Sequence, residues 1–142
     1  MDYGRRRIGV AVTDPTQTIS SPHTVIEQER GPRLVPEALI QLIEELRPCA
    51  IVVGIPFQLD GMEGEMAREA RAFAAALQAR TGVPIVEWDE RLSTVRAERE
   101  IRALDLPLKR RREKGIADRM AAALILEAYL RSRPASRGDS ES

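Results

Sequence analysis

Carboxylate side chains occur at three points of the chain where an expected strand or helix begins or ends. Asp2 comes just before a turn that leads into an apolar run, and Asp89 and Glu90 directly follow another apolar run. Asp118 lies in the first turn expected for the last helix. Because ligand sites of open α/β sheets collect at strand ends, these four side chains are candidates for one site.

A cluster of carboxylates is stable only when a cation offsets the repulsion between their negative charges. Mg²⁺ suits such a cluster, since it takes oxygen ligands and is often bound by a few carboxylates together with substrate phosphates. Two ions roughly 3.5–4 Å apart can activate water and stabilise the leaving oxygen in phosphodiester hydrolysis. The alternative is that the acids are helix caps and solvent-facing charges, and their spacing alone does not decide between the two.

Other catalytic arrangements have less support in the sequence. One cysteine and one histidine exclude a Cys/His zinc cluster, and no serine or cysteine nucleophile has a usable histidine partner. Gly4 and Gly9 could form a phosphate-cradling turn after Asp2, as in an actin-like or sugar-kinase-like ATPase. Those enzymes bind nucleotide between two such domains, and at roughly 100–200 residues per domain this chain has room for one.

The charge of the chain is unevenly distributed although its sum is zero. The 142 residues include 22 basic and 22 acidic side chains, and residues 27–90 carry a net charge of −6 while residues 91–119 carry +5. A basic run of this kind suits phosphate binding, although alone it is equally typical of a solvated face or a loop. The run consists of Lys109, Arg110, Arg111, Arg112 and Lys114.

The elements that must position these residues alternate between strands and helices. Strands are expected at residues 8–12, around 24–26, at 49–55 and at 84–88, with an interruption at Ser20-Ser21-Pro22. The continuous apolar run at 49–55 is typical of a strand that is buried on both faces.

Helices are expected between these strands and at the end of the chain. The first lies between Pro36 and Pro48, and the second covers residues 65–80 and ends at Gly82. A third begins at Ser93 or Thr94 and runs to about Leu104. The last covers about residues 116–131 and is expected to bury Met120, Leu124, Ile125 and Ala128.

This order predicts an α/β fold in which a mixed β-sheet is flanked by helices in a single domain over residues 1–131. The polar tail, residues 132–142, has nothing to bury and is expected to be disordered. No apolar run approaches the roughly 18 residues of a membrane span and no signal peptide is recognisable. Together with the single cysteine, this favours a cytoplasmic protein that does not bind membranes.

Four motifs follow one another over about residues 2–130. They are Asp2-Tyr3-Gly4 with Arg6-Arg7-Ile8-Gly9-Val10-Ala11, then Val53-Gly54-Ile55-Pro56 with Asp60-Gly61, then Asp89-Glu90-Arg91-Leu92-Ser93-Thr94, and finally Ala117-Asp118 with Ala121-Ala122 and Ile125-Leu126. In this order they resemble the bacterial YqgF family, also called RuvX. Its members are described as Holliday junction resolvases and as nucleases that mature the 16S ribosomal RNA precursor.

The resemblance implies an RNase H-like fold and a nuclease site that uses Mg²⁺ or Mn²⁺. It implies Asp2, Glu90 and Asp118 as metal ligands, with Asp89 as a further catalytic candidate. Either Asp89 or Glu90 can be the ligand, and the other can orient Arg91 or a metal-bound water. The residues expected to meet the nucleic-acid backbone are Arg6, Arg7, Arg91, Lys109, Arg110, Arg111, Arg112 and Lys114.

The activity expected from this resemblance is endonucleolytic cleavage of structured RNA at the 5′ end of the 16S rRNA precursor, as a step of ribosome biogenesis. A Holliday junction resolvase-type DNA endonuclease and a non-catalytic RNA-binding assembly factor are the alternatives. The expected partners are therefore rRNA precursor, branched DNA and ribosomal particles, and the sequence does not choose between a monomer and a homodimer.

The start of the chain departs from the family pattern. Several apolar residues precede the Asp-Tyr-Gly motif in the family and form the body of a central first strand, whereas here Asp2 directly follows Met1. We expect the natural start to lie a few codons upstream, because loss of a central strand would expose apolar edges and leave Asp2 on a frayed terminus.

Overall fold

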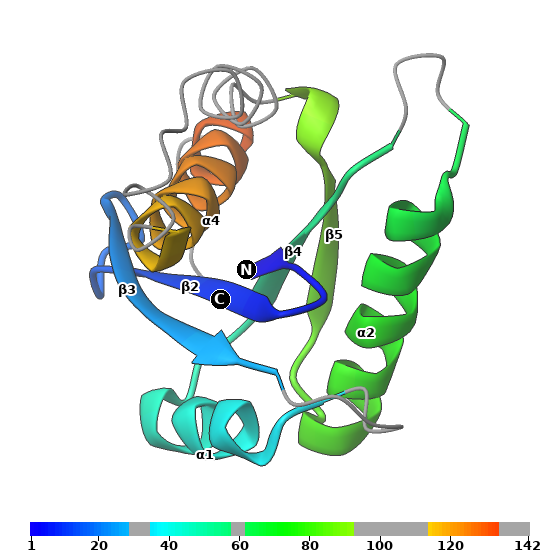
Figure 1. Ribbon diagram of the computed structural model, residues 1–142. Helices are drawn as coiled ribbons and strands as arrows, with labels where there is room; N and C mark the ends of the chain where they lie inside the picture. The colour runs from blue at the N-terminus through cyan, green and yellow to red at the C-terminus, as the bar shows by residue number, and fades with distance from the viewer. Residues whose placement is uncertain (29–34, 58–61, 93–113, 134–142) are drawn as a thin grey trace.

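The computed structural model describes residues 1–28, 35–57, 62–92 and 114–133, the last segment with side chains from residue 118 onward (Figure 1). Five strands and three α-helices occur in this part of the chain, in the order β1, β2, β3, α1, β4, α2, β5 and α4. No helix in these ranges is long and apolar enough to cross a membrane.

The first three strands form an antiparallel sheet. β1 (Asp2–Tyr3) pairs with β2 (Arg7–Thr13), which pairs along its whole length with β3 (Ser20–Glu27). The expected interruption at Ser20-Ser21-Pro22 is wrong, because these residues belong to β3. β3 lies at the edge of this sheet, where a proline without an N–H is tolerated, and Pro22 pairs with Ala11 next to a bulge.

The last two strands form a parallel pair, and Met1 joins this pair to the first sheet. β4 (Ile51–Ile55) and β5 (Ile85–Asp89) are in register from end to end. The Met1 amine donates a hydrogen bond to the Val52 carbonyl at 2.5 Å, and the Gly54 N–H donates to the Met1 carbonyl at 3.1 Å. The five strands therefore lie in the spatial order β3-β2-β1-β4-β5, with the N-terminus in the middle of the layer (Figure 1).

The helix ends follow the local signals of the sequence. α1 (Glu37–Leu46) begins after Pro36 and ends at Arg47, whose backbone is left-handed with φ 48°. α2 (Glu65–Thr81) ends at Gly82, which has φ 72° and so takes the conformation that favours glycine. α4 (Lys114–Ser132) extends the expected last helix by two residues at its start and by Ser132 at its end.

Helices cover both faces of the strands, and the side chains of β4 alternate between them. Ile51, Val53 and Ile55 pack in the cluster formed with α1 and α2, which includes Phe73. Val52 packs with Ala121 and Ile125 of α4 in a second cluster on the other face. Both faces of β4 are thus buried, which confirms the interpretation of its apolar run and the expected α/β fold with strands of both orientations.

One expectation for α4 is wrong. Met120 is 41% exposed, whereas the small residues Ala121 and Ala122 are buried against the strands. Small side chains at this position let the helix approach the sheet closely. The expected burial of Ile125 is confirmed, since its side chain is fully buried.

The expected helix between Ser93 and Leu104, the basic residues 109–112 and the tail beyond residue 133 lie outside the described residues.

Close packing of α4 on β2 depends on Gly9. A Cβ atom at this residue would lie 2.1 Å from the backbone carbonyl oxygen of Asp118, so any side chain would push α4 away from the strand. We predict that Gly9→Ala lowers the free energy of unfolding by about 1–3 kcal/mol, as overpacking of a core does. Urea denaturation measures the change, with Ala72→Ser on the exposed face of α2 as a control expected within about 0.5 kcal/mol. A Gly9→Ala protein as stable as the control would contradict this packing.

Candidate active site

Asp2 lies at the centre of the strand layer. It is the first residue of β1, pairs with Gly9 of β2, and is 8% exposed. Burial of a carboxylate costs several kcal/mol unless polar or charged groups compensate it, so a buried Asp at a strand position indicates a functional role more strongly than an exposed one.

Glu90 lies beside β4, and a glycine leaves the room for its carboxylate. It follows the last residue of β5 and begins a short 3₁₀-helix (Glu90–Leu92), and it is 3% exposed. A Cβ atom at Gly54 would lie 2.7 Å from Glu90 Oε2 and 2.6 Å from the Ile125 side chain. Gly54 therefore forms part of the space that holds this carboxylate against the sheet.

Asp118 approaches the same region from α4. Its backbone lies against Gly9, the residue that pairs with Asp2. Its carboxylate accepts a hydrogen bond from Arg7 Nε at 2.8 Å, and both side chains are 28% exposed. α4 begins at Lys114, so Asp118 lies in the second turn of the helix and the expectation of a first-turn position is wrong.

Asp89 and Glu90 have different surroundings in the structure. The Asp89 carboxylate accepts hydrogen bonds from the Arg91 guanidinium at 2.6 and 3.0 Å and from the Arg91 backbone N–H at 2.9 Å. The Arg91 contact lowers the pKa of Asp89. Arg91 also lies over the ring of Phe57, 5.6 Å from its centroid. Asp89 thus holds Arg91 in place, while Glu90 is buried.

The N-terminal amine lies in the same electrostatic environment as the two buried acids. Burial lowers the pKa of the Met1 amine to about 6, and the negative charges of Asp2 and Glu90 oppose this shift. Asp2 and Glu90 are therefore both near the amine.

The three predicted metal ligands do not form a ready-made metal site. Within residues 1–28, 35–57, 62–92 and 118–133, no three His, Cys, Asp or Glu side chains are grouped so that they could hold a metal ion. Asp118 is held by Arg7 through Oδ2, one of the two oxygens of its carboxylate.

The predicted phosphate-binding arginines differ in what they contact. Arg6 is exposed, Arg7 pairs with Asp118, and Arg91 pairs with Asp89. Of the basic run, Lys109, Arg110, Arg111 and Arg112 lie outside the described residues, as does the side chain of Lys114.

Comparisons with known proteins agree with this arrangement of motifs. The family model described as "RuvX: Holliday junction resolvase" matches residues 1–132. The chain belongs to the RuvX family. It is 41% identical to a protein of Paracoccus denitrificans (strain Pd 1222) over 130 residues, which cover 92% of this chain and 80% of that protein.

Two further RuvX relatives extend the likeness to other bacteria. The chain is 39% identical to a protein of Syntrophomonas wolfei subsp. wolfei, with 92% of this chain and 90% of that protein covered. It is 36% identical to a protein of Lachnospira eligens, with coverage of 94% and 95%. All three relatives carry the name "Putative pre-16S rRNA nuclease".

Two features of this RuvX site were missed by reasoning from the sequence. The first is the role of Gly9 and Gly54 as spaces for the α4 backbone and the Glu90 carboxylate. A glycine inside an apolar strand is a signal of close approach and could have indicated it. The second is the ion pair between Arg7 and Asp118, two residues 111 positions apart that no local pattern connects.

The Arg7–Asp118 pair is half-buried, so its strength can be measured in this RuvX protein. In a double-mutant cycle of Arg7→Gln and Asp118→Asn with a chelator present, we predict a coupling energy of about 1 kcal/mol from urea denaturation. The exposed pair of Arg80 and Glu37, 2.8 Å apart, is the control and is expected to give about 0–0.5 kcal/mol. Equal coupling in the two cycles would show that Arg7 does not hold Asp118.

Proposed function

We propose that this protein is a metal-dependent endonuclease that hydrolyses phosphodiester bonds in structured RNA and matures the 5′ end of the 16S rRNA precursor. The observation that carries the proposal is the burial of two acids, Asp2 and Glu90, around β1 and β4 at the centre of the sheet. Two buried like charges repel each other, and a bound divalent cation would offset that repulsion.

The residues present fit a hard divalent cation. The donors offered by Asp2, Glu90 and Asp118 are carboxylate oxygens, which Mg²⁺ and Mn²⁺ prefer. The absence of a Cβ atom at Gly54 lets the Glu90 carboxylate lie against β4, in a position that a side chain at residue 54 would block. When bound, the metal would polarise the scissile phosphate and lower the pKa of an attacking water.

Three arginines of the chain support binding of the substrate. Arg7 bonds Asp118 through Nε, and in the described part of the chain no acceptor is bound to its terminal nitrogens, which leaves them for a phosphate oxygen. Asp89 and the ring of Phe57 fix the Arg91 guanidinium from two sides, so little entropy is lost when Arg91 binds an anion. Arg6 is exposed and adds a third positive charge near the end of β1.

The choice of RNA rests on the relatives rather than on the geometry. Proteins 36–41% identical to this chain carry a name that specifies pre-16S rRNA, whereas the family description specifies Holliday junctions. Both substrates present closely spaced phosphates, so the carboxylate site does not distinguish them. We propose the rRNA precursor, with a cytoplasmic location where ribosomal particles assemble.

Measurements of metal affinity distinguish the roles of the two adjacent acids, Asp89 and Glu90. We predict that Glu90→Gln weakens Mn²⁺ binding at least tenfold, because it removes a buried oxygen ligand, whereas Asp89→Asn changes it less than about threefold. Isothermal titration calorimetry of each variant and the unchanged chain gives the dissociation constants. The reverse order of the two effects would assign the ligand to Asp89 and contradict the site described above.

Cleavage tests the activity itself. With a labelled 16S rRNA precursor and Mg²⁺, we predict that Asp2→Asn, Glu90→Gln and Asp118→Asn each reduce the rate at least about 100-fold, since each removes a ligand of the reacting centre. Asp89→Asn, which releases Arg91 but removes no proposed ligand, should weaken RNA binding and lower the rate far less than the three ligand variants.

Two outcomes would contradict the proposed function. Cleavage that survives both Asp118→Asn and chelation would exclude metal-dependent chemistry at these acids. Salt-sensitive RNA binding without turnover, unchanged in all three variants, would instead identify a non-catalytic assembly factor. A four-way DNA junction in a parallel reaction shows whether the substrate is RNA or branched DNA.

A further inference from the structure

The two residues of β1 point to opposite faces of the strand layer. Asp2 pairs with Gly9, and a Cβ atom at Gly9 would lie against the Asp118 backbone of α4, so Asp2 points to the α4 face. Successive side chains of a strand alternate, so Tyr3 points to the face that α2 covers. There its ring lies beside the ring of the fully buried Phe73, with the centroids 4.7 Å apart. α2 therefore holds β1 from the face opposite to the candidate metal site.

A second side chain of the same segment is bound to α2. Arg5, in the turn between β1 and β2, donates to both carboxylate oxygens of Glu69 from Nε, at 3.0 and 3.1 Å, and to one of them from a terminal nitrogen at 2.6 Å. The same terminal nitrogen lies 3.3 Å from a Glu65 oxygen. Glu65, Glu69 and Phe73 are spaced by four residues, so one stripe of α2 contacts the chain from Tyr3 to Arg5.

The turn that carries Arg5 is also held from the β3 side. The Gln28 side-chain amide donates to the Gly4 carbonyl, and the Gln28 backbone N–H donates to the Arg6 carbonyl at 2.8 Å. A Cβ atom at Gly4 would lie 2.8 Å from the Arg7 carbonyl oxygen, so the turn is tight. The turn is therefore fixed on two sides, by α2 and by the end of β3.

The exposure of the Arg5–Glu69 pair indicates a geometric role rather than a large contribution to stability. The two side chains are 56% and 32% exposed, and exposed ion pairs add little to the free energy of unfolding. A bidentate contact between a guanidinium and a carboxylate nevertheless fixes the relative orientation of the two groups. The contact lowers the pKa of Glu69 and raises that of Arg5, so both groups are charged at neutral pH. Because β1 has only two residues, the position of Asp2 depends on the turn that follows it.

We propose that Arg5 is a positioning residue for metal binding. Through its bidentate contact with Glu69 it fixes the turn between β1 and β2 against α2, and thereby the place of the Asp2 carboxylate on the α4 face. This inference rests on the proposed function, in which Asp2 is a metal ligand. Residues that orient a ligand directly change metal affinity by roughly 10–100-fold, so Arg5, which acts through the backbone, should have a smaller effect of about three- to tenfold.

Mn²⁺ binding by the full chain tests this role. We expect Arg5→Gln and Glu69→Gln each to raise the Mn²⁺ dissociation constant about three- to tenfold in isothermal titration calorimetry. A charge effect alone would give opposite signs, because Arg5→Gln removes a positive charge and Glu69→Gln removes a negative one. The double variant with Arg5→Glu and Glu69→Arg forms the ion pair in reverse and should return the dissociation constant to within about twofold of its original value.

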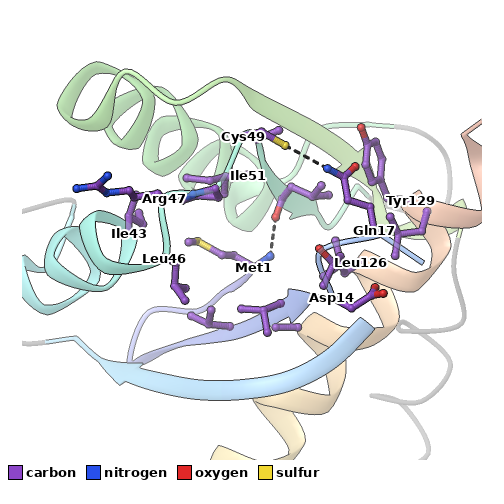
Figure 2. Close-up of a pocket in the computed structure, with 18 of the residues that line it drawn as sticks. Met1, Asp14, Gln17, Ile43, Leu46, Arg47, Cys49, Ile51, Leu126 and Tyr129 are labelled. Atoms are coloured by element: carbon purple, nitrogen blue, oxygen red, sulfur yellow. Dashed lines mark hydrogen bonds between the residues drawn. The ribbon is translucent and has the colours of Figure 1, made fainter. Parts of the chain in front are cut away.

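Two control variants remove side-chain contacts elsewhere. Arg80→Gln removes an exposed ion pair between the same helix and Glu37, 2.8 Å long. Gln17→Asn shortens a side chain at the end of β2 opposite the turn, where the Gln17 amide bonds the Cys49 sulfur at 3.6 Å beside a pocket of about 400 Å³ (Figure 2). Both controls should leave the Mn²⁺ dissociation constant within about 1.5-fold, and all of the single variants should melt within about 3 °C of the unchanged chain.

Amide hydrogen exchange of the metal-free chain gives a readout that does not depend on the metal. Exchange at residues 2–4 should be at least about threefold faster in Arg5→Gln and Glu69→Gln and unchanged in the two controls. Equal exchange in all variants, unchanged Mn²⁺ dissociation constants, or constants that change in opposite directions would overturn the inference and leave the proposed function standing. Absence of Mn²⁺ binding by the unchanged chain would contradict the proposed function and, with it, this inference.

Discussion

The backbone pairing of the first three residues holds the molecule together at its centre. Met1 bonds Val52 and Gly54 of the parallel pair, and Asp2 and Tyr3 pair with β2 of the antiparallel sheet. A segment this short makes the only strand-type connection between the two sheets within the part of the chain that the structure describes. The position of Asp2, and through Gly9 the position of α4, depends on it.

Two glycines allow residues of the candidate site to pack against these strands. Gly9 lets the α4 backbone contact β2, the strand that pairs with Asp2. Asp118 of α4 therefore lies next to β2, where it bonds Arg7. Gly54, on the neighbouring strand, lets the Glu90 carboxylate lie against the sheet. The acids come from distant points of the sequence, and close approach at Gly9 and Gly54 lets the Asp118 backbone and the Glu90 carboxylate lie against strands next to β1. The candidate site is thus a consequence of packing density at two residues without side chains.

Much of the fold follows from local signals in the sequence. The apolar run at 49–55 predicts β4, and Pro48 and Gly82 mark the regions where α1 and α2 end. Other features depend on contacts between distant residues and could not be predicted. Pro22 is accepted within β3 because that strand lies at an edge, and Met120 turns outward because the adjacent alanines pack better. Likewise, Asp89 and Glu90 have the same charge and adjacent positions, and only the turn at 90–92, with Arg91 bound to Asp89, decides which one is buried.

The proposed function requires Asp2, Glu90 and Asp118 to bind one divalent-metal centre. The most direct measurement is anomalous X-ray diffraction from crystals of the full chain soaked in Mn²⁺. We predict an anomalous peak roughly 2.0–2.3 Å from oxygens of Asp2 and Glu90, with an oxygen of the Asp118 carboxylate among its ligands. A peak bound by Asp89, or no peak at these acids at a saturating Mn²⁺ concentration, would contradict it.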